Sequence, residues 1–257
     1  MFNLAPVPVP DLTGKTVLVT GAGRGIGAET VRVLVDSSAH VFAGIFDDHA
    51  DTNEPLPEAA TRLSLDVNSQ AQVDAAIDRL REEAGRLDVL VNNAGTIAPI
   101  GHVSSLDSDD LIPALSVNVA GVHRVTVAAL PLLRESRGVV INAGTGAATK
   151  PMEGWTAYCT SKAAMHMLTQ MFDLELSDDG VKSFFIGIPP TDTAMQGAIR
   201  ESGLNPISRI SQSDLVPTAV SASVIAWLCG PEARKLDDVI LDVRQERFTA
   251  MMDLQSD

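Results

Sequence analysis

Basic residues, cysteines and long apolar runs are scarce in this sequence, and each shortage excludes a class of protein. The chain carries 19 Lys and Arg residues against 33 Asp and Glu residues, which gives a formal net charge of −14. A protein that binds nucleic acid or an anionic membrane needs a basic face, so we expect neither partner. No stretch approaches the roughly 18 unbroken apolar residues that a membrane-spanning helix needs.

The two cysteines, Cys159 and Cys229, are too few for a disulfide framework. They fit a reducing compartment, so we expect a cytoplasmic protein in which each is a small buried apolar residue. The sequence gives no reason to expect a metal site. Residues 1–10 lack the basic start of a signal peptide and carry three alternating prolines. This favours an extended N-terminal arm, either packed on a partner subunit or disordered.

Short apolar runs alternate with helical patterns along the rest of the chain, and neither a repeat nor a linker divides it. With 45% hydrophobic residues, residues 11–257 can bury one sizeable core. Such alternation implies parallel strands, which predicts a single α/β domain with a Rossmann fold and a doubly wound parallel sheet of about seven strands. The predicted strands are Lys15–Thr20, His40–Phe46, Arg62–Leu65, Leu87–Val91, Gly138–Ile141, Val181–Ile188 and Val239–Val243.

Helix signals lie between these strands. Ser69 opens a capping-box pattern with Gln72, and Pro217 and Gly230 bracket a helix near the C-terminus. Residues 191–216 are polar and irregular, which predicts an insertion that serves as a substrate lid. The other predicted helices are Gly25–Asp36, Ser108–Arg134 and Trp155–Leu176.

A glycine-rich turn joins the first predicted strand to the first helix. Glycines there let the backbone turn sharply and approach a pyrophosphate, which then lies on the helix N-terminus. A glycine-rich turn alone is weak support, because a purely structural turn has the same composition. The candidate cofactor-binding residues in this turn are Gly21, Gly23, Arg24, Gly25, Ile26 and Gly27.

Tyr158 and Lys162 stand four residues apart, so on a helix they share one face. A free tyrosine has a pKa near 10, and a neighbouring ammonium together with the cationic nicotinamide of an oxidised cofactor would favour the phenolate. We therefore predict a lowered Tyr158 pKa and a role in proton transfer to a carbonyl or from an alcohol. The alternative is an ordinary helix with a packed tyrosine and an exposed lysine.

Several motifs that follow one another along the chain decide between these alternatives. Thr20–Gly27 matches T-G-x-x-x-G-x-G, Asn92–Gly95 reads N-N-A-G, and Asn118 and Thr145 precede Y-x-x-x-K. Together they resemble the short-chain dehydrogenase/reductase family over nearly the whole chain, from about Asp11 to Val243. The stretch Asp192–Gln196 is similar to benzil reductase and sepiapterin reductase relatives.

The resemblance implies an oxidoreductase that moves a hydride between a nicotinamide cofactor and a ketone or secondary alcohol. It makes Tyr158 the general acid/base, while Lys162 lowers its pKa and bonds the nicotinamide ribose. Thr145 would hydrogen-bond the substrate oxygen, and Asn118 would hold a water that links Lys162 to solvent. The further cofactor contacts that it implies are Asn92, Ala94, Gly95, Pro189, Thr191 and Thr193.

The chain departs from the family pattern at two places. Thr145 stands where Ser is usual, which keeps the hydroxyl but stiffens χ1. Pro190 follows Pro189 in place of glycine and removes a backbone donor near the nicotinamide carboxamide. These departures keep open an alternative function, a cofactor-binding sensor with little turnover.

The choice between NAD and NADP depends on the end of the second strand. Asp47 lies just beyond it, where a carboxylate would repel a 2′-phosphate, so we predict NAD. Arg24 in the glycine turn is the competing indication for NADP. Asp66 and Val67 should border the adenine, although Asp66 also suits a plain turn.

The resemblance also suggests the substrate pocket and the assembly. Residues 96–101, Gly154-Trp155 and Met195 would form an apolar site, although Trp155 and Met195 suit a core equally well. Family members are dimers or tetramers that pack through the helices of Asn118 and Tyr158. We therefore expect a homodimer or homotetramer.

Overall fold

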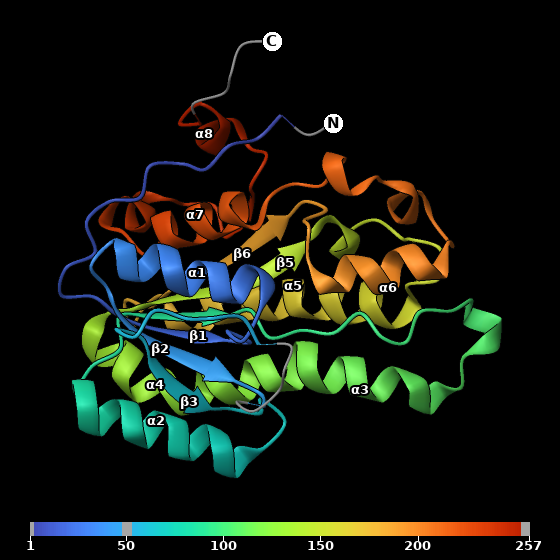
Figure 1. The fold of residues 1–257 in the computed structure, drawn as a ribbon. Coiled ribbons are helices and arrows are strands. Elements are labelled where there is room, and N and C mark those ends of the chain that lie inside the picture. The colour runs from blue at the N-terminus through green and yellow to red at the C-terminus, as the bar shows by residue number, and fades with distance from the viewer. Residues whose placement is uncertain (1–2, 48–52, 253–257) are drawn as a thin grey trace.

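The computed structural model describes residues 3–47 and 53–252, which form a seven-stranded parallel sheet between two layers of helices (Figure 1). The strand order is β3-β2-β1-β4-β5-β6-β7, so the predicted doubly wound Rossmann sheet is confirmed. The fifth strand continues to Thr145 instead of ending at Ile141 as predicted. The strands are β1 (Thr16–Thr20), β2 (His40–Ile45), β3 (Thr61–Ser64), β4 (Val89–Asn92), β5 (Val139–Thr145), β6 (Lys182–Ile188) and β7 (Ile240–Asp242).

Helices α1 and α7 cover one face of the sheet, and α2, α4 and α5 cover the other (Figure 1). Successive residues of β1 alternate between the layers: Val17 and Val19 pack under α1 and α7, whereas Leu18 packs toward α2. Burial on both faces explains why the strands are almost continuously apolar. The helices are α1 (Gly25–Asp36), α2 (Gln70–Ala84), α3 (Ile112–Leu115), α4 (Val122–Ser136), α5 (Thr156–Leu176), α6 (Ala194–Ser202), α7 (Thr218–Leu228) and α8 (Glu246–Thr249).

The predicted capping box at the start of α2 is only half formed. Ser69 Oγ accepts a hydrogen bond from the Gln72 backbone N–H at 3.3 Å. The Gln72 side chain, however, accepts from the Asp66 backbone N–H at 2.8 Å instead of returning to Ser69. Gln72 therefore ties the helix to the turn after β3.

The predicted N-terminal arm packs on its own chain. Residues 3–10 run from near α8 along α7 (Figure 1), and Val7 is buried. The Val7 backbone N–H donates to Ser223 Oγ at 2.9 Å, and that of Ala5 donates to Met252 Sδ at 3.4 Å. The arm thus closes the apolar layer over α7.

The segment from residue 191 to 216 is more regular than predicted. It contains α6 and two 3₁₀ turns, and an isolated bridge joins Thr191 to Val216. Gln196 and Asn205 are buried, and their side-chain amides donate to backbone oxygens of Ile207 and Glu153. The segment forms a packed wall, and its movement as a lid stays a prediction.

One helical run, Ser108–Ser136, is long and apolar enough to cross a membrane by length and composition alone. The core helix of a soluble protein meets the same criteria, and here the run packs on α2 and α5. Its middle, Ser116–Gly121, has π-helical hydrogen bonding. Such π turns occur frequently at functional sites, and this one holds Asn118.

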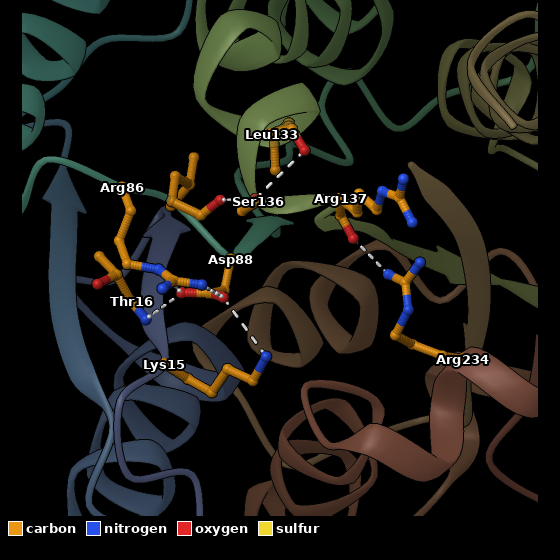
Figure 2. Close-up of polar contacts among 9 residues, drawn as sticks. Lys15, Thr16, Arg86, Asp88, Leu133, Ser136, Arg137 and Arg234 are labelled. Atoms are coloured by element: carbon orange, nitrogen blue, oxygen red, sulfur yellow. Dashed lines mark hydrogen bonds and ion pairs between the residues drawn. The ribbon is translucent and has the colours of Figure 1, made fainter. Parts of the chain in front are cut away.

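The opposite, amino-terminal ends of the strands are held by a buried carboxylate. Asp88 is 3% exposed and accepts hydrogen bonds from the Thr16 backbone N–H at 3.0 Å and from Arg86 Nε at 2.9 Å. Lys15 Nζ approaches it to 3.4 Å, and Figure 2 shows the three donors converging on this side chain. Asp88 therefore joins the starts of β1 and β4.

Replacing Asp88 by Asn should destabilise the fold, because Arg86 and Lys15 then lose their charged acceptor. We expect the free energy of unfolding to fall by about 1.5–3 kcal/mol, as for hydrogen bonds to charged groups. Urea unfolding followed by circular dichroism measures it. The control is Asp78→Asn, which removes the exposed pair with Arg81 and should cost less than about 1 kcal/mol. An equal loss of unfolding free energy in the two variants would contradict the role of Asp88 in joining β1 and β4.

Candidate active site

A cavity of about 280 Å³ opens at the carboxyl ends of the central strands. This edge is where the chain order reverses between β1 and β4, the usual ligand site of a doubly wound sheet. Several predicted site residues meet there although they come from segments far apart in the sequence. Those that line the cavity are Ile26, Gly95, Thr145, Tyr158, Lys162, Pro189, Thr191 and Thr193.

Two hydroxyl groups lie side by side in this cavity. Thr145 ends β5, and its Oγ1 accepts a hydrogen bond from the Ala147 N–H at 3.3 Å. Tyr158 lies in the first turn of α5, where the Thr145 side chain interacts with its phenol and lowers the pKa of that group. The Trp155 ring meets that of Tyr158 edge-on, with centroids 5.6 Å apart, and so fixes the direction of the phenol.

Burial dominates the electrostatics of the pair Tyr158 and Lys162. It raises the pKa of Tyr158 to about 12, and the interaction with Thr145 offsets only part of this rise. Burial also lowers the pKa of Lys162 to about 8. The Lys162 ammonium donates to the Ala143 carbonyl at 2.9 Å and lies 5.9 Å from the phenol ring centre. The predicted lowering of the Tyr158 pKa is therefore wrong for the protein chain on its own.

Asn118 is fully buried and joins two parts of the site. Its Oδ1 accepts from the Thr96 N–H at 2.9 Å, and its Nδ2 donates to the Thr96 carbonyl at 2.8 Å and to Ser161 Oγ at 2.9 Å. A Cβ on Gly95 would lie 3.3 Å from Asn118 Oδ1 and 3.6 Å from Lys162 Nζ. Asn118 thus fixes the loop after β4 against α5, and its predicted water bridge to Lys162 stays a prediction.

Two glycines of the turn stand where a side chain would clash with neighbouring backbone. Gly21 has φ +64°, and a Cβ there would lie 2.7 Å from the Ala94 Cα; one on Gly27 would lie 2.2 Å from the Gly21 carbonyl oxygen. Asn93 Nδ2 donates to the carbonyls of Thr20 and Gly21, each at 3.1 Å. This cradle at the start of α1 fits a dinucleotide pyrophosphate. Asn93, which also lines the cavity, was not among the predicted site residues.

A carboxylate that the sequence did not single out lies on this turn. Glu54 accepts from the Gly25 N–H at 2.6 Å and from Arg32 Nη2 at 2.8 Å, and its own N–H donates to the Gly23 carbonyl at 2.7 Å. Burial alone would raise the Glu54 pKa, but the bonds from Arg32 and Gly25 outweigh it and hold that pKa below its usual value. Glu54 therefore places a negative charge at the first amide of α1.

The two predicted cofactor-selecting residues, Asp47 and Arg24, are both exposed. The Asp47 carbonyl accepts from Asn53 Nδ2 at 2.6 Å. Arg24 is the N-cap residue of α1. Asp66 Oδ1 accepts from the Asn68 N–H at 2.9 Å. Asp66 therefore stabilises a turn, which is the alternative role that the sequence left open for it.

Val67 and Asn92 serve the packing around the site. Val67 is buried, and its Cγ2 lies 2.7 Å from where a Cβ on Gly121 would be. Asn92 is buried with its Nδ2 bonded to Asn142 Oδ1 at 2.9 Å, which joins β4 to β5. Their contact with a cofactor stays a prediction, as does that of Ala94.

Past β6, two threonines and two prolines shape the wall. The Pro190 carbonyl accepts from the Val216 N–H at 3.0 Å, and Thr191 Oγ1 donates to the Pro189 carbonyl at 2.8 Å. A Cβ on Gly25 would touch the Thr193 methyl at 3.3 Å. The start of α6 therefore closes against the glycine turn in spite of the second proline.

The remaining wall of the cavity is mostly apolar. Trp155 and Met195, which the sequence left undecided between pocket and core, both line it. Residues 96–101 contribute Ile97. The other apolar residues on this side are Met152, Ile199 and Ile207.

Known proteins place this arrangement in a family. A short chain dehydrogenase family model matches residues 15–203. A benzil reductase that forms (S)-benzoin, from Saccharomyces cerevisiae, is 30% identical over 84% of this chain and 90% of its own. A 2,3-dihydro-2,3-dihydroxybenzoate dehydrogenase from Escherichia coli K12 is 38% identical over 72% of this chain and 73% of its own.

A solved structure shares this fold over almost the full chain. The 3-ketoacyl-(acyl-carrier-protein) reductase from Brucella melitensis, complexed with NADH, superposes with a TM-score of 0.79 and 24% identity. The superposition covers 92% of this chain and 99% of that one. The chain therefore belongs to the short-chain dehydrogenase family of oxidoreductases.

Proposed function

We propose that this protein reduces a ketone or oxidises the matching secondary alcohol, with Tyr158 as the general acid/base. The observation that carries the proposal is the pairing of the Tyr158 and Thr145 hydroxyls in a mostly apolar cavity. Both groups can reach one substrate oxygen. The second candidate function, a cofactor-binding sensor, gains no specific support, because Thr145 keeps its hydroxyl at the site.

Each residue then has a defined task. A bound nicotinamide supplies or accepts the hydride. Tyr158 gives its proton to the carbonyl oxygen in reduction, while Thr145 donates a hydrogen bond to that oxygen and orients it. Lys162 places a cation behind the phenol and stabilises the phenolate that remains. Asn118 positions this group by holding α5 against the loop after β4.

The proposal is tested by steady-state reduction of a ketone panel with NADH. The apolar wall of the cavity favours 1-phenyl-1,2-propanedione and benzil over acetone, because burial of the aryl ring adds binding free energy. The similarity to a benzil reductase supports the same choice. Binding of NADH without turnover of any ketone or alcohol would favour the sensor function instead.

We also propose that the cofactor is NAD and that Glu54, in place of Asp47, selects it. The Glu54 carboxylate lies on Gly25 at the start of α1, where it would repel a 2′-phosphate on the adjacent ribose. The glycine turn and Lys162 would hold the cofactor at its two ends, with Thr191 and Thr193 along the wall between them.

Replacing Glu54 by Gln keeps the shape of the side chain and removes its charge. We expect NADPH to bind about tenfold more tightly to this variant, a change of about 1.4 kcal/mol, and the NADH dissociation constant to change much less. Titration of both cofactors at low, fixed ionic strength measures this. Glu58→Gln, an exposed residue in the same loop, is the matched control. Equal tightening of NADH and NADPH would show that Glu54 competes for the pyrophosphate site instead of selecting.

We further propose that the protein forms a homodimer or homotetramer through α4 and α5. Several large apolar side chains are exposed on these helices. In the most apolar part of the helical run Ser108–Ser136, only 33% of the residues are buried in the single chain. A second copy would cover them. Sedimentation velocity gives the assembly, and a monomer at micromolar concentration would refute it. The exposed residues are Val127, Met167, Met171 and Leu174.

A further inference from the structure

The charged side chains that line the cavity are positive, whereas the molecule as a whole has a negative net charge. Although the chain has a net charge of −14, three basic side chains line the cavity, and no Asp or Glu appears among the described residues that do so. Lys162 belongs to the catalytic group, and the other two, Lys150 and Arg244, have no task in the proposed reaction. Their presence in an otherwise apolar wall points to a negatively charged group on the ligand.

Arg244 reaches this cavity from the far edge of the sheet. Asp242, at the end of β7, pairs in register with Gly187 of β6, and Gly187 pairs with Gly144 of β5. The residues that follow β7 therefore leave the sheet at the same height along the strands as Thr145. A Cβ on Gly146 would lie 3.7 Å from Arg244 Nη2, so the guanidinium lies next to the residue that follows Thr145.

The position of Arg244 makes the phosphates of the cofactor an unsuitable partner for it. The glycine turn follows β1, and β5, beside whose end the guanidinium lies, is two strand spacings away in the sheet order, on the order of 10 Å. Arg244 is thus at the substrate end of the cavity, with Met152 and Trp155 also among the lining residues.

The Arg244 side chain is held in place by Asp242 before any ligand binds. Its Nε donates to Asp242 Oδ1 at 2.7 Å and its Nη2 donates to Asp242 Oδ2 at 2.6 Å. This two-point contact raises the Arg244 pKa further and fixes the plane of the guanidinium. Among the described contacts, Nη1 has no acceptor, so its two N–H groups remain for a ligand.

We infer that Arg244 binds a carboxylate on the substrate, so that the ketone reduced here is an oxo acid with an apolar, aryl-sized body. This inference rests on the proposed function and narrows its substrate class. A carboxylate near the carbonyl would accept from Nη1 while the carbonyl oxygen meets Tyr158 and Thr145. Reduction adds a hydride from NADH or NADPH to the carbonyl carbon and a proton from Tyr158 to its oxygen, and the carboxylate is unchanged.

Two substrates of matched size test this inference. Phenylglyoxylate carries a carboxylate beside its ketone, and 1-phenyl-1,2-propanedione carries an acetyl group there. We expect Arg244→Gln to raise KM for phenylglyoxylate about tenfold or more, as loss of a charged hydrogen bond does, and to leave KM for the dione nearly unchanged. Arg247→Gln, which removes an arginine that pairs with Asp238 and does not line the cavity, should leave the ratio of the two KM values at the wild-type value.

Turnover of the dione with no effect of Arg244→Gln on phenylglyoxylate would overturn the inference and leave the proposed function intact. If neither compound turns over, calorimetric titration with mandelate and with neutral 1-phenyl-1,2-ethanediol, in the presence of NAD, still decides it. Mandelate binding that is lost in Arg244→Gln, with diol binding retained, would support the carboxylate contact. Equal mandelate affinity in the two proteins would refute it.

Discussion

Replacement of Tyr158 by Phe is expected to lower kcat by roughly 10²–10⁴-fold, the usual contribution of a general acid/base. The substitution removes one oxygen and keeps the ring, so the edge-on contact with Trp155 survives. Thr145 then still orients the substrate oxygen, but no group in contact with that oxygen can transfer the proton. The dissociation constants of NADH and ketone should change little, because the lost interaction matters most in the transition state.

Steady-state kinetics with NADH and 1-phenyl-1,2-propanedione measure this loss, and direct titration measures cofactor binding. Cys159→Ala is the matched control, since Cys159 neighbours Tyr158 on α5 but does not line the cavity. It should keep nearly wild-type kcat. Full activity in Tyr158→Phe would refute the assigned mechanism, whereas joint loss of activity and cofactor binding would indicate a structural defect.

The parts of the site that the sequence predicted are those carried by short, local patterns. Tyr158 and Lys162 lie on one helix face, and the glycine turn lies between one strand and the next helix, so their spacing alone fixes their relation. The seven strands were predictable for a related reason. The five inner strands, β1, β2, β4, β5 and β6, are buried on both faces, so each reads as a short apolar run between polar connections.

Glu54 and Arg244 were missed because tertiary contacts place them. Glu54 reaches Gly25 across 29 residues of sequence, through an irregular loop that no periodic pattern describes. Arg244 enters the cavity only because β7 pairs beside β6. Asp47 was predicted by counting along one strand, a method that does not show how the following loop folds back, and its role in cofactor selection stays a prediction.

The direction of the Tyr158 pKa was missed for an energetic reason. The sequence places an ammonium one helical turn away, but it does not show that this ammonium donates to the Ala143 carbonyl. Nor does it show how deeply the phenol is buried. Desolvation of the phenolate then raises the pKa by more than Thr145 lowers it.

This reversal can be measured without any substitution, because Tyr158 is the only tyrosine in the chain. Phenolate absorbance near 295 nm therefore reports one group. In the cofactor-free protein the titration midpoint should lie near 12. Saturating NAD should bring the midpoint down toward the working pH, because a cationic ring beside the phenol favours the phenolate.

If the protein unfolds in alkali, the exposed Tyr158 titrates at a lower pH than the folded one. The dependence of stability on the protonation of Tyr158 and Lys162 therefore has to be considered. The folded Tyr158 pKa lies above the ordinary value of 10.0, so the protonated phenol stabilises the fold below pH 10 and that contribution is lost between pH 10 and about 12. Lys162 acts in the opposite sense: its folded pKa of about 8 lies below 10.5, so stability rises with pH between these values. Circular dichroism at each pH identifies points where the chain has unfolded. A midpoint near 10 in folded, cofactor-free protein would show that burial does not control the phenol, and a midpoint unmoved by NAD would remove Tyr158 from the proposed proton transfer.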